Sequence, residues 1–330
     1  MFHHHSESIL PGAPWLIAHR SMLGTNRPHK IALNGRDYVL WQNQHGEIFA
    51  LDNICPHLQA PLSDGWICHE RNTITCPFHA LEFNAAGCLQ NNKQSSNQPL
   101  IDPLKLVVEG DYIWSYGKAS PQLPIPDLLQ TLPSGMTFIG VAVDRTVQAA
   151  FLPNLLINYD YNHLVGLHKD LFKVKANRVL SFTTEGYQAA VTQETERMQL
   201  SLSEAFQDPV LLLTPKVYQS RLDYRFPAIT AYRGLFPLGE LLQVNILYPE
   251  TATTTHSFAL VWVKYRSPLL QIIPKQILLD VINAGIEQDL SMVERCYLRQ
   301  PAKIRLPDEN MMDYAQKLYI DWNASSLSKG

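Results

Sequence analysis

Two short segments that carry the same mixed pair of metal-binding side chains constrain this chain more than any other feature. The first reads Cys55-Pro56-His57, the second reads Cys76-Pro77-Phe78-His79, and residues 58–75 separate them. Zinc is one candidate metal, because Zn²⁺ accepts two Cys and two His in a tetrahedron. Zinc spacing usually places Cys with Cys and His with His, whereas a two-iron, two-sulfide cluster can take both cysteines on one iron and both histidines on the other. The interleaved order therefore favours the iron–sulfur cluster.

Length, charge and cysteine content exclude several classes of protein. At roughly 150 residues per domain, 330 residues indicate about two domains. The chain has 27 Lys and Arg against 30 Asp and Glu, and this net charge of −3 argues against a nucleic-acid-binding surface. Five thinly spread cysteines, an odd number, do not make a disulfide framework. The sequence has no apolar run long enough to span a membrane and no signal-peptide pattern, which predicts a cytoplasmic protein.

The succession of strand and helix patterns predicts an α+β protein with two domains. Residues 1–118 form short β-rich runs between Gly, Asn, Pro and Asp turns, which is typical of a small all-β domain. Several prolines in residues 119–134 indicate an extended linker. Residues 135–330 mix strand and helix patterns and predict an antiparallel sheet followed by a long terminal helix.

Three further predictions in the second domain concern single elements. Helical patterns cover residues 151–169 and 274–299, with Pro274 in the first turn of the second helix. A strand-like run at 198–202 follows another at 187–192.

The two Cys/His segments closely resemble those of the Rieske family, whose pattern is Cys-x-His, a spacer of this length and Cys-x-x-His. The resemblance implies a Rieske [2Fe-2S] domain in residues 1–118, with Cys55, His57, Cys76 and His79 as the cluster ligands. Other potential ligands nearby lack this spacing, and we interpret them as ordinary hairpin residues: Cys68, His69 and Cys88.

The chain departs from the family pattern at several loop positions. High-potential members have an extra cysteine in each loop and a serine that donates to a bridging sulfide, where this chain has Ala60, Phe78 and Leu81. Because hydrogen bonds to the sulfurs raise the reduction potential, their absence implies the low, oxygenase-type end of the Rieske range. Many oxygenases also have Arg-Gly after the first His and Gly-Trp after the second, where this chain has Leu58-Gln59 and Ala80-Leu81.

A second group of candidate ligands lies in residues 158–168. Asp160 and His163 are three residues apart and share a face of any helix. His168 follows five residues after His163, which places it about 140° away on a regular helix. Binding of both imidazoles to one metal therefore requires a bend or a π-type widening near Gly166. Two histidines without further ligands are more often core or surface residues than metal ligands.

Asp289 is the candidate for a third ligand, because it falls on the apolar stripe of the helical pattern at 274–299. The other members of this stripe are Leu278, Ile282, Ile286, Val293 and Cys296. An ionised carboxylate is costly to bury unless it is paired or bound to a metal, so the alternative role for Asp289 is a salt bridge to another element. Two histidines and one carboxylate form a facial triad that binds Fe(II) and leaves positions open for O₂.

The pattern Asp-x-x-His-x-x-x-x-His, followed far downstream by Gln288-Asp289, resembles the catalytic half of Rieske non-heme iron oxygenases. The resemblance implies a helix-grip, START-like catalytic domain in residues 135–330, with His163, His168 and Asp289 as ligands of a mononuclear Fe(II). It also implies that Asp160 transfers electrons across a subunit boundary through a hydrogen bond to His79. The family often has a polar residue where this chain has Leu156, and Asn154 and Asn158 flank that position.

Together the two resemblances imply a terminal oxygenase α subunit of the short, homotrimeric type. Such a protein uses O₂ and externally supplied electrons to monooxygenate a small molecule by hydroxylation or demethylation. The chain has no nucleotide-binding glycine fingerprint, so NAD(P)H must be oxidised by a separate reductase, directly or through a ferredoxin. Low charge and many aromatic residues favour a largely apolar, aromatic or polycyclic substrate.

Three alternatives remain open at this point: a Rieske-type electron-transfer or ligand-binding protein without oxygenase activity, a ring-dihydroxylating dioxygenase, and a zinc protein without a redox role. Six residues are candidates for the substrate pocket, although core packing is the commoner role of such side chains. They are Tyr159, Leu164, Val165, Leu235, Phe236 and Tyr248.

Overall fold

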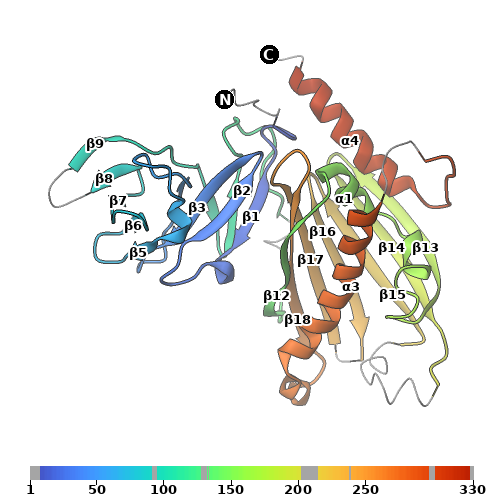
Figure 1. Cartoon of the computed structure of the whole chain (residues 1–330). Coiled ribbons are helices and arrows are strands. Elements are labelled where there is room, and N and C mark those ends of the chain that lie inside the picture. Colours follow the sequence, from blue (N-terminus) through green and yellow to red (C-terminus); the bar gives the residue numbers. More distant parts are fainter. Residues whose placement is uncertain are drawn as a thin grey trace. The chain divides into compact units, whose positions relative to one another are not determined.

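The computed structural model describes residues 8–90, 95–127, 132, 134–201, 215–237, 239–296 and 302–327. The chain divides into two compact units (Figure 1). The first consists of Met1–Ile125 with Tyr248–Thr253, and the second of Pro126–Leu247 with Thr254–Gly330. The α+β fold class is confirmed, whereas the limits of the linker at 119–134 stay a prediction.

The first unit contains three small sheets with the strand orders β1-β11-β10, β2-β3-β4 and β5-β6-β7-β8-β9. The pairings recorded between these strands are antiparallel. The strands are β1 (Trp15–His19), β2 (His29–Leu33), β3 (Arg36–Gln42), β4 (Ile48–Asp52), β5 (Trp66–Cys68), β6 (Thr73–Thr75), β7 (Glu82–Phe83), β8 (Cys88–Gln90), β9 (Ser95–Pro99), β10 (Val107–Glu109) and β11 (Tyr112–Ser115).

A buried apolar cluster in the first unit includes the two predicted cysteine ligands. Cys55 and Cys76 pack with Trp41, Ile74 and Phe83, and each of the two cysteines is only 1% exposed. The core therefore holds the sulfur end of the predicted cluster site in place.

The second unit is built on a seven-stranded sheet with the order β12-β18-β17-β16-β15-β14-β13. Its strands are β12 (Thr137–Val147), β13 (Val174–Glu185), β14 (Gln188–Arg197), β15 (Val217–Arg225), β16 (Ile229–Phe236), β17 (Gly239–Pro249) and β18 (Thr255–Tyr265). Its α-helices are α1 (Phe151–Ile157), α3 (Lys275–Arg295) and α4 (Asn310–Leu327). Figure 1 shows α3 lying across one face of this sheet, as predicted for a helix-grip domain.

The long helix α3 forms where its apolar residues recur at helical spacing. Ile282, Ile286, Leu290 and Val293 are buried, and they pack against residues of β12 and β18. The helix begins after Pro274, which is its N-cap and not, as predicted, part of its first turn. Residues 297–299 of the predicted helix lie outside the described residues.

Two predictions about the end of this helix were wrong. The backbone is extended at Cys296, so this residue caps the helix and is exposed instead of lying on the apolar stripe. The helix is also not terminal, because α4 follows it and buries Met311, Ala315 and Trp322. Among the described residues, no helix is long and apolar enough to cross a membrane.

The predicted helix at 151–169 is broken into α1 and a short 3₁₀ helix at Asn162–Val165. The Asn158 side chain donates to the Asn154 carbonyl at the end of α1 (2.8 Å), and the Asp160 carboxylate accepts the Asn162 N–H (2.8 Å). Such local side-chain bonds offer the backbone an alternative to helix, which explains the break.

The predicted strand at 198–202 is also absent from the part that is described. Strand β14 ends at Arg197, and the N–H of Met198 donates to the Lys173 carbonyl (2.6 Å). Residues 198–201 are irregular, and Leu202 lies outside the described residues.

A buried tyrosine anchors the segment that leads into the second predicted site. Tyr159 is fully buried, and its hydroxyl accepts a hydrogen bond from Thr230 of β16 (2.9 Å). Its ring packs edge-on against Tyr224 at 4.5 Å between centroids. These contacts tie the residue before Asp160 to the sheet.

We predict that Tyr159→Phe lowers the free energy of unfolding by about 1–3 kcal/mol, because it leaves the buried Thr230 hydroxyl without this partner. Tyr187→Phe is the control, since Tyr187 is 43% exposed and its loss of a hydroxyl should cost less than about 0.5 kcal/mol. Chemical denaturation of both variants measures the difference, and equal stabilities would contradict the anchoring role.

Candidate metal centres

The two Cys/His segments form loops with the same backbone hydrogen bonds. In the first loop, Cys55 N–H donates to the Ala60 carbonyl (2.9 Å) and Gln59 N–H donates to the Cys55 carbonyl (2.9 Å). In the second, Cys76 N–H donates to the Leu81 carbonyl (2.8 Å) and Ala80 N–H donates to the Cys76 carbonyl (3.1 Å). The sequence thus presents its two ligand pairs on two copies of one loop conformation.

Each loop contains one residue in the left-handed backbone region. These residues are Gln59 (φ 62°) and Ala80 (φ 55°), which occupy the positions where many oxygenases have glycine. A residue with a Cβ atom pays roughly 1–2 kcal/mol for this conformation, whereas glycine adopts it freely. The loop conformation is thus retained here although both residues have Cβ atoms.

The four side chains of these loops place thiols inside and imidazoles outside. Cys55 and Cys76 are buried, whereas His57 and His79 are exposed, and the two Nδ1 atoms are 3.2 Å apart. Two imidazole nitrogens that bind one metal at about 2.1 Å are separated by about 3 Å, so this pair fits a shared metal. Burial, together with the neighbouring Cys76, raises the pKa of the Cys55 thiol, so the positive charge of iron would be needed to hold the thiolate.

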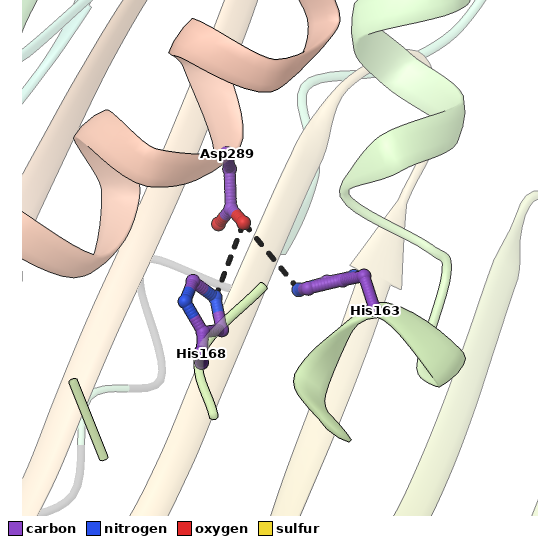
Figure 2. Close-up of side chains that lie close together, drawn as sticks. All are labelled: His163, His168 and Asp289. Carbon is purple, nitrogen blue, oxygen red and sulfur yellow. Dashed lines mark ion pairs between the residues drawn. The ribbon is translucent and has the colours of Figure 1, made fainter. Parts of the chain in front are cut away.

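The second group of predicted ligands comes together from two distant segments (Figure 2). One carboxylate oxygen of Asp289 lies 3.4 Å from His163 Nε2 and 3.1 Å from His168 Nε2. One ligand atom from each of the three side chains lies within 4.8 Å of the others. His163 lies in the 3₁₀ helix, whereas His168 follows it in a turn, so the required bend is a helix end and not a π-type widening.

Two buried polar atoms of this triad lack a hydrogen-bond partner among the described residues. Asp289 Oδ1 and His163 Nδ1 are both buried without a hydrogen bond. Burial lowers the pKa of His163, which favours the neutral imidazole that a metal requires. For His168, burial acts in the same direction, but the nearby Asp289 and Gln288 together raise its pKa. A cation bound between the two Nε2 atoms and Asp289 Oδ1 would satisfy this carboxylate oxygen, so the three residues fit a divalent metal.

Gln288, the neighbour of Asp289 on α3, orients one of the two imidazoles. Its side-chain oxygen lies 2.8 Å from His168 Nδ1 and accepts the proton of that nitrogen. This hydrogen bond leaves Nε2, the nitrogen that faces Asp289, free to bind a metal. Phe172 packs edge-on against the same ring, with 5.4 Å between the centroids. Gly285 leaves room for Phe172, because a Cβ atom at position 285 would lie 3.0 Å from the Phe172 ring.

The triad lies on the wall of a cavity of about 290 Å³ inside the second unit. Side chains of α3, of residues 158–172 and of one sheet face line this cavity. Asp160 and Asn158 line it as well, but Asn154 is fully buried away from it. Of the six predicted pocket residues, Leu164 and Phe236 line the cavity; Tyr159, Val165, Leu235 and Tyr248 do not.

Sequence reasoning missed the polar side chains that the sheet contributes to this cavity. Gln193 and Thr195 reach it from β14, and Gln243 and Asn245 reach it from β17. In β17 the alternation of polar residues with the buried Leu242, Val244 and Ile246 was a signal that could have identified this face.

Comparisons with known proteins concern the Rieske domain and the fold of the chain. A protein-family model for the Rieske [2Fe-2S] domain matches residues 14–107. The chain is 26% identical to aminopyrrolnitrin oxygenase PrnD of Pseudomonas fluorescens over 47% of this chain and 46% of that protein. It is 29% identical to 4beta-methylsterol monooxygenase of Methylococcus capsulatus over 39% and 37% of the two chains. The matched segments thus span less than half the length of these relatives.

The fold has a counterpart over the whole chain. The crystal structure of dicamba monooxygenase bound to dicamba superposes with a TM-score of 0.72 at 17% identity, covering 97% of this chain and 99% of that one. The chain therefore contains a Rieske [2Fe-2S] domain, and its fold is that of dicamba monooxygenase. The His/His/Asp site of the second unit fits a mononuclear iron.

We predict that Cys55→Ser abolishes the visible absorption bands of the Rieske cluster and lowers the iron content by about two atoms per chain, because serine does not supply the thiolate that the cluster requires. The matched control is Cys68→Ser, a cysteine of β5 outside the paired loops, and this variant should keep both the bands and the iron. Loss of the bands in the control, or their retention in Cys55→Ser, would contradict the ligand assignment.

We also predict that Gln288→Leu weakens Fe(II) binding at the mononuclear site about 10- to 100-fold, since the orienting hydrogen bond to His168 is lost. Gln276→Leu changes an exposed glutamine of the same helix and should bind Fe(II) like the unaltered protein. Competition with a chelator measures both affinities. Equal affinities in the two variants would show that Gln288 does not orient the ligand.

Proposed function

We propose that this protein is the terminal oxygenase of a multicomponent system, which uses O₂ and externally supplied electrons to monooxygenate a small aromatic or polycyclic molecule. The observation that carries this proposal is the position of His163, His168 and Asp289 on the wall of a partly open cavity. A metal in this position faces the space where a small molecule can bind. A purely structural metal would be enclosed by protein ligands instead.

The residues of each site have separate roles in this proposal. Cys55, His57, Cys76 and His79 hold the cluster, whereas His163, His168 and Asp289 hold Fe(II) and leave part of its coordination sphere to ligands from the cavity. When bound, the two metal centres supply stepwise electron transfer and O₂ activation.

The cavity residues position the substrate and limit water. Ile286 and Ile282 of α3 present apolar surface about one and two turns before Asp289, and Leu164 does so beside His163. Apolar walls exclude water from the reacting atoms and favour burial of a ring system.

Electrons have to reach the cluster from another protein, and the exposed imidazole end is the place for such a contact. Beside His57 and His79, the apolar side chains of Leu58 and Phe78 are 59% and 61% exposed. Exposed apolar groups of this size are typical of surfaces that bind partners. We therefore assign this surface to contacts with a reductase or ferredoxin, which oxidises NAD(P)H, and with a neighbouring subunit.

A homotrimer is part of the same proposal. Asp160 lines the cavity close to His163, and in a closed ring of subunits it would bridge to His79 of the next subunit. A cytoplasmic location, which gives access to NAD(P)H-dependent reductases, also belongs to the proposal.

The names of the relatives support oxidation of aromatic or polycyclic substrates. Among them are a 3-ketosteroid-9-alpha-monooxygenase of Rhodococcus rhodochrous and a dicamba O-demethylase of Stenotrophomonas maltophilia. They cover both hydroxylation and demethylation, so the type of monooxygenation in this protein is a separate question.

Iron content and NADH-driven O₂ consumption test the proposal together. We expect about three iron atoms per chain, visible bands that bleach with dithionite, and O₂ uptake with a supplied reductase and ferredoxin when a neutral aromatic compound is added. Asp289→Ala should hold about two iron atoms, keep the bands and lose at least about 100-fold in O₂ uptake. His256→Ala, which changes a histidine paired with Asp144, is the control and should retain all three properties.

Other results would contradict the oxygenase assignment. A protein with two iron atoms and no O₂ uptake is an electron carrier, and a colourless protein with zinc has no redox role. Incorporation of two atoms from ¹⁸O₂ into one product would replace monooxygenation with dihydroxylation.

A further inference from the structure

The charged groups of the cavity disfavour an anionic substrate. Among the described residues, the cavity lining contains the carboxylates of Asp160, Glu240 and Asp289 but no Lys or Arg side chain. Two of these carboxylates already face positive or metal-binding groups: Asp289 faces the two histidines, and Glu240 lies 3.7 Å from Arg233. The lining therefore offers neither a side-chain cation for an anionic ligand nor a cluster of unpaired acids for a cationic one.

The two polar side chains that β14 contributes to the cavity, Gln193 and Thr195, are hydrogen-bonded to other side chains of the sheet. Gln193 accepts from Asn177 (3.0 Å) and donates to Ser220 (3.1 Å), and Thr195 donates to Asn177 (2.9 Å). Gln193, Thr195 and Ser220 are nearly fully buried. Because their hydrogen-bonding capacity is largely used within this network, they stabilise the sheet face and offer little to a ligand.

Gln243 and Asn245 differ from this network. They are neighbours on the same face of β17, and their only recorded hydrogen bond joins Gln243 Nε2 to Asn245 Oδ1 (2.9 Å). Gln243 Oε1 and Asn245 Nδ2 have no hydrogen-bond partner recorded among the described residues, although both side chains are only partly exposed and line the cavity. Exchanging the O and N positions of both side-chain amides would reverse the hydrogen bond between them. The pair would still have one C=O acceptor and one N–H donor free for a ligand.

The rest of the cavity sets the size and polarity of the other part of the ligand. Leu241, Leu278, Val281 and Ile286 supply apolar wall. A volume of about 290 Å³ lies at the small end of the range for ligand pockets, roughly 300–1,000 Å³, and suits a molecule of one to three rings.

We propose that the substrate is an uncharged ring compound that carries a neighbouring N–H donor and C=O acceptor, as in an amide or lactam, and that Gln243 and Asn245 recognise this group. The inference rests on the proposed function, since it names the substrate class of the same cavity. It narrows the expectation of a largely apolar substrate, because an apolar molecule would leave the two free amide groups of β17 without partners. A polar site of this kind rejects ligands that lack the matching group.

Equilibrium binding of three probes of nearly equal size tests the inference on the full-length, iron-loaded protein. The probes are 2-naphthamide, its anionic counterpart 2-naphthoate, and naphthalene, and isothermal titration calorimetry measures their dissociation constants. We expect 2-naphthamide to bind at least tenfold more tightly than either of the others. Naphthalene has no group that pairs with the free amide groups of Gln243 and Asn245, and 2-naphthoate carries a negative charge and has no N–H donor.

Two variants connect this preference to the residues. Gln243→Leu and Asn245→Leu should each weaken 2-naphthamide binding about tenfold while leaving naphthalene binding within about twofold. Retained naphthalene binding shows that the cavity is still folded. The matched control is Gln219→Leu, which changes an exposed glutamine of β15 and should leave all three affinities unchanged.

The outcomes separate this inference from the oxygenase proposal. Equal affinity for the three probes, tighter binding of 2-naphthoate, no binding of 2-naphthamide, or an amide preference that survives both variants would overturn the inference. NADH-driven turnover of naphthalene without an amide preference refutes only the substrate class. A Gln243- and Asn245-dependent amide preference in a protein that never consumes O₂ supports the substrate class and refutes the oxygenase proposal.

Discussion

The candidate iron site of the second unit depends on one carboxylate held between two imidazoles on the apolar face of a helix. Asp289 occupies a position of α3 whose neighbours on the same face are buried, and its Oδ1 lies 3.4 and 3.1 Å from the two histidines. Asp289 is only partly exposed and its Oδ1 atom is buried, so the cost of withdrawing this charge from water has to be offset by groups outside α3. His163 lies in the 3₁₀ helix and His168 in the turn that follows it. These two imidazoles, together with a bound metal, are the groups of the triad that can offset this cost.

In the first unit the burial of the candidate ligands differs between the two residue types. There the apolar core encloses the thiols of Cys55 and Cys76, while the imidazoles of His57 and His79 project from the surface. A cluster held in this way has a buried end and an accessible end, and electrons enter and leave most readily at the accessible one. The left-handed Gln59 and Ala80 preserve the loop conformation that makes this arrangement possible.

Much of both candidate sites was predictable because the proposed ligands are unusual residues in unusual places. Paired Cys and His at short spacing have few structural roles in a chain with so few cysteines, and an aspartate on an apolar stripe requires a partner. The breaks in regular structure were not predictable, because helix periodicity continued through 151–169 while local bonds of Asn158 and Asp160 ended the helix. The helix α4 was missed because its pattern is only weakly amphipathic, with few buried residues.

The sequence alone therefore determined the kinds of ligand, their order along the chain and the α+β class, since these follow from side-chain chemistry and spacing. The resemblance grouped His163, His168 and Asp289, but only the tertiary structure decided the distances between them and which face of each strand meets the cavity. A separation of more than a hundred positions between His168 and Asp289 contains no information about their distance, and alternation along β17 defines two faces without saying what covers either one. The helix α3 covers one face of the sheet (Figure 1). Gln243 and Asn245 line the cavity that also contains the candidate metal ligands.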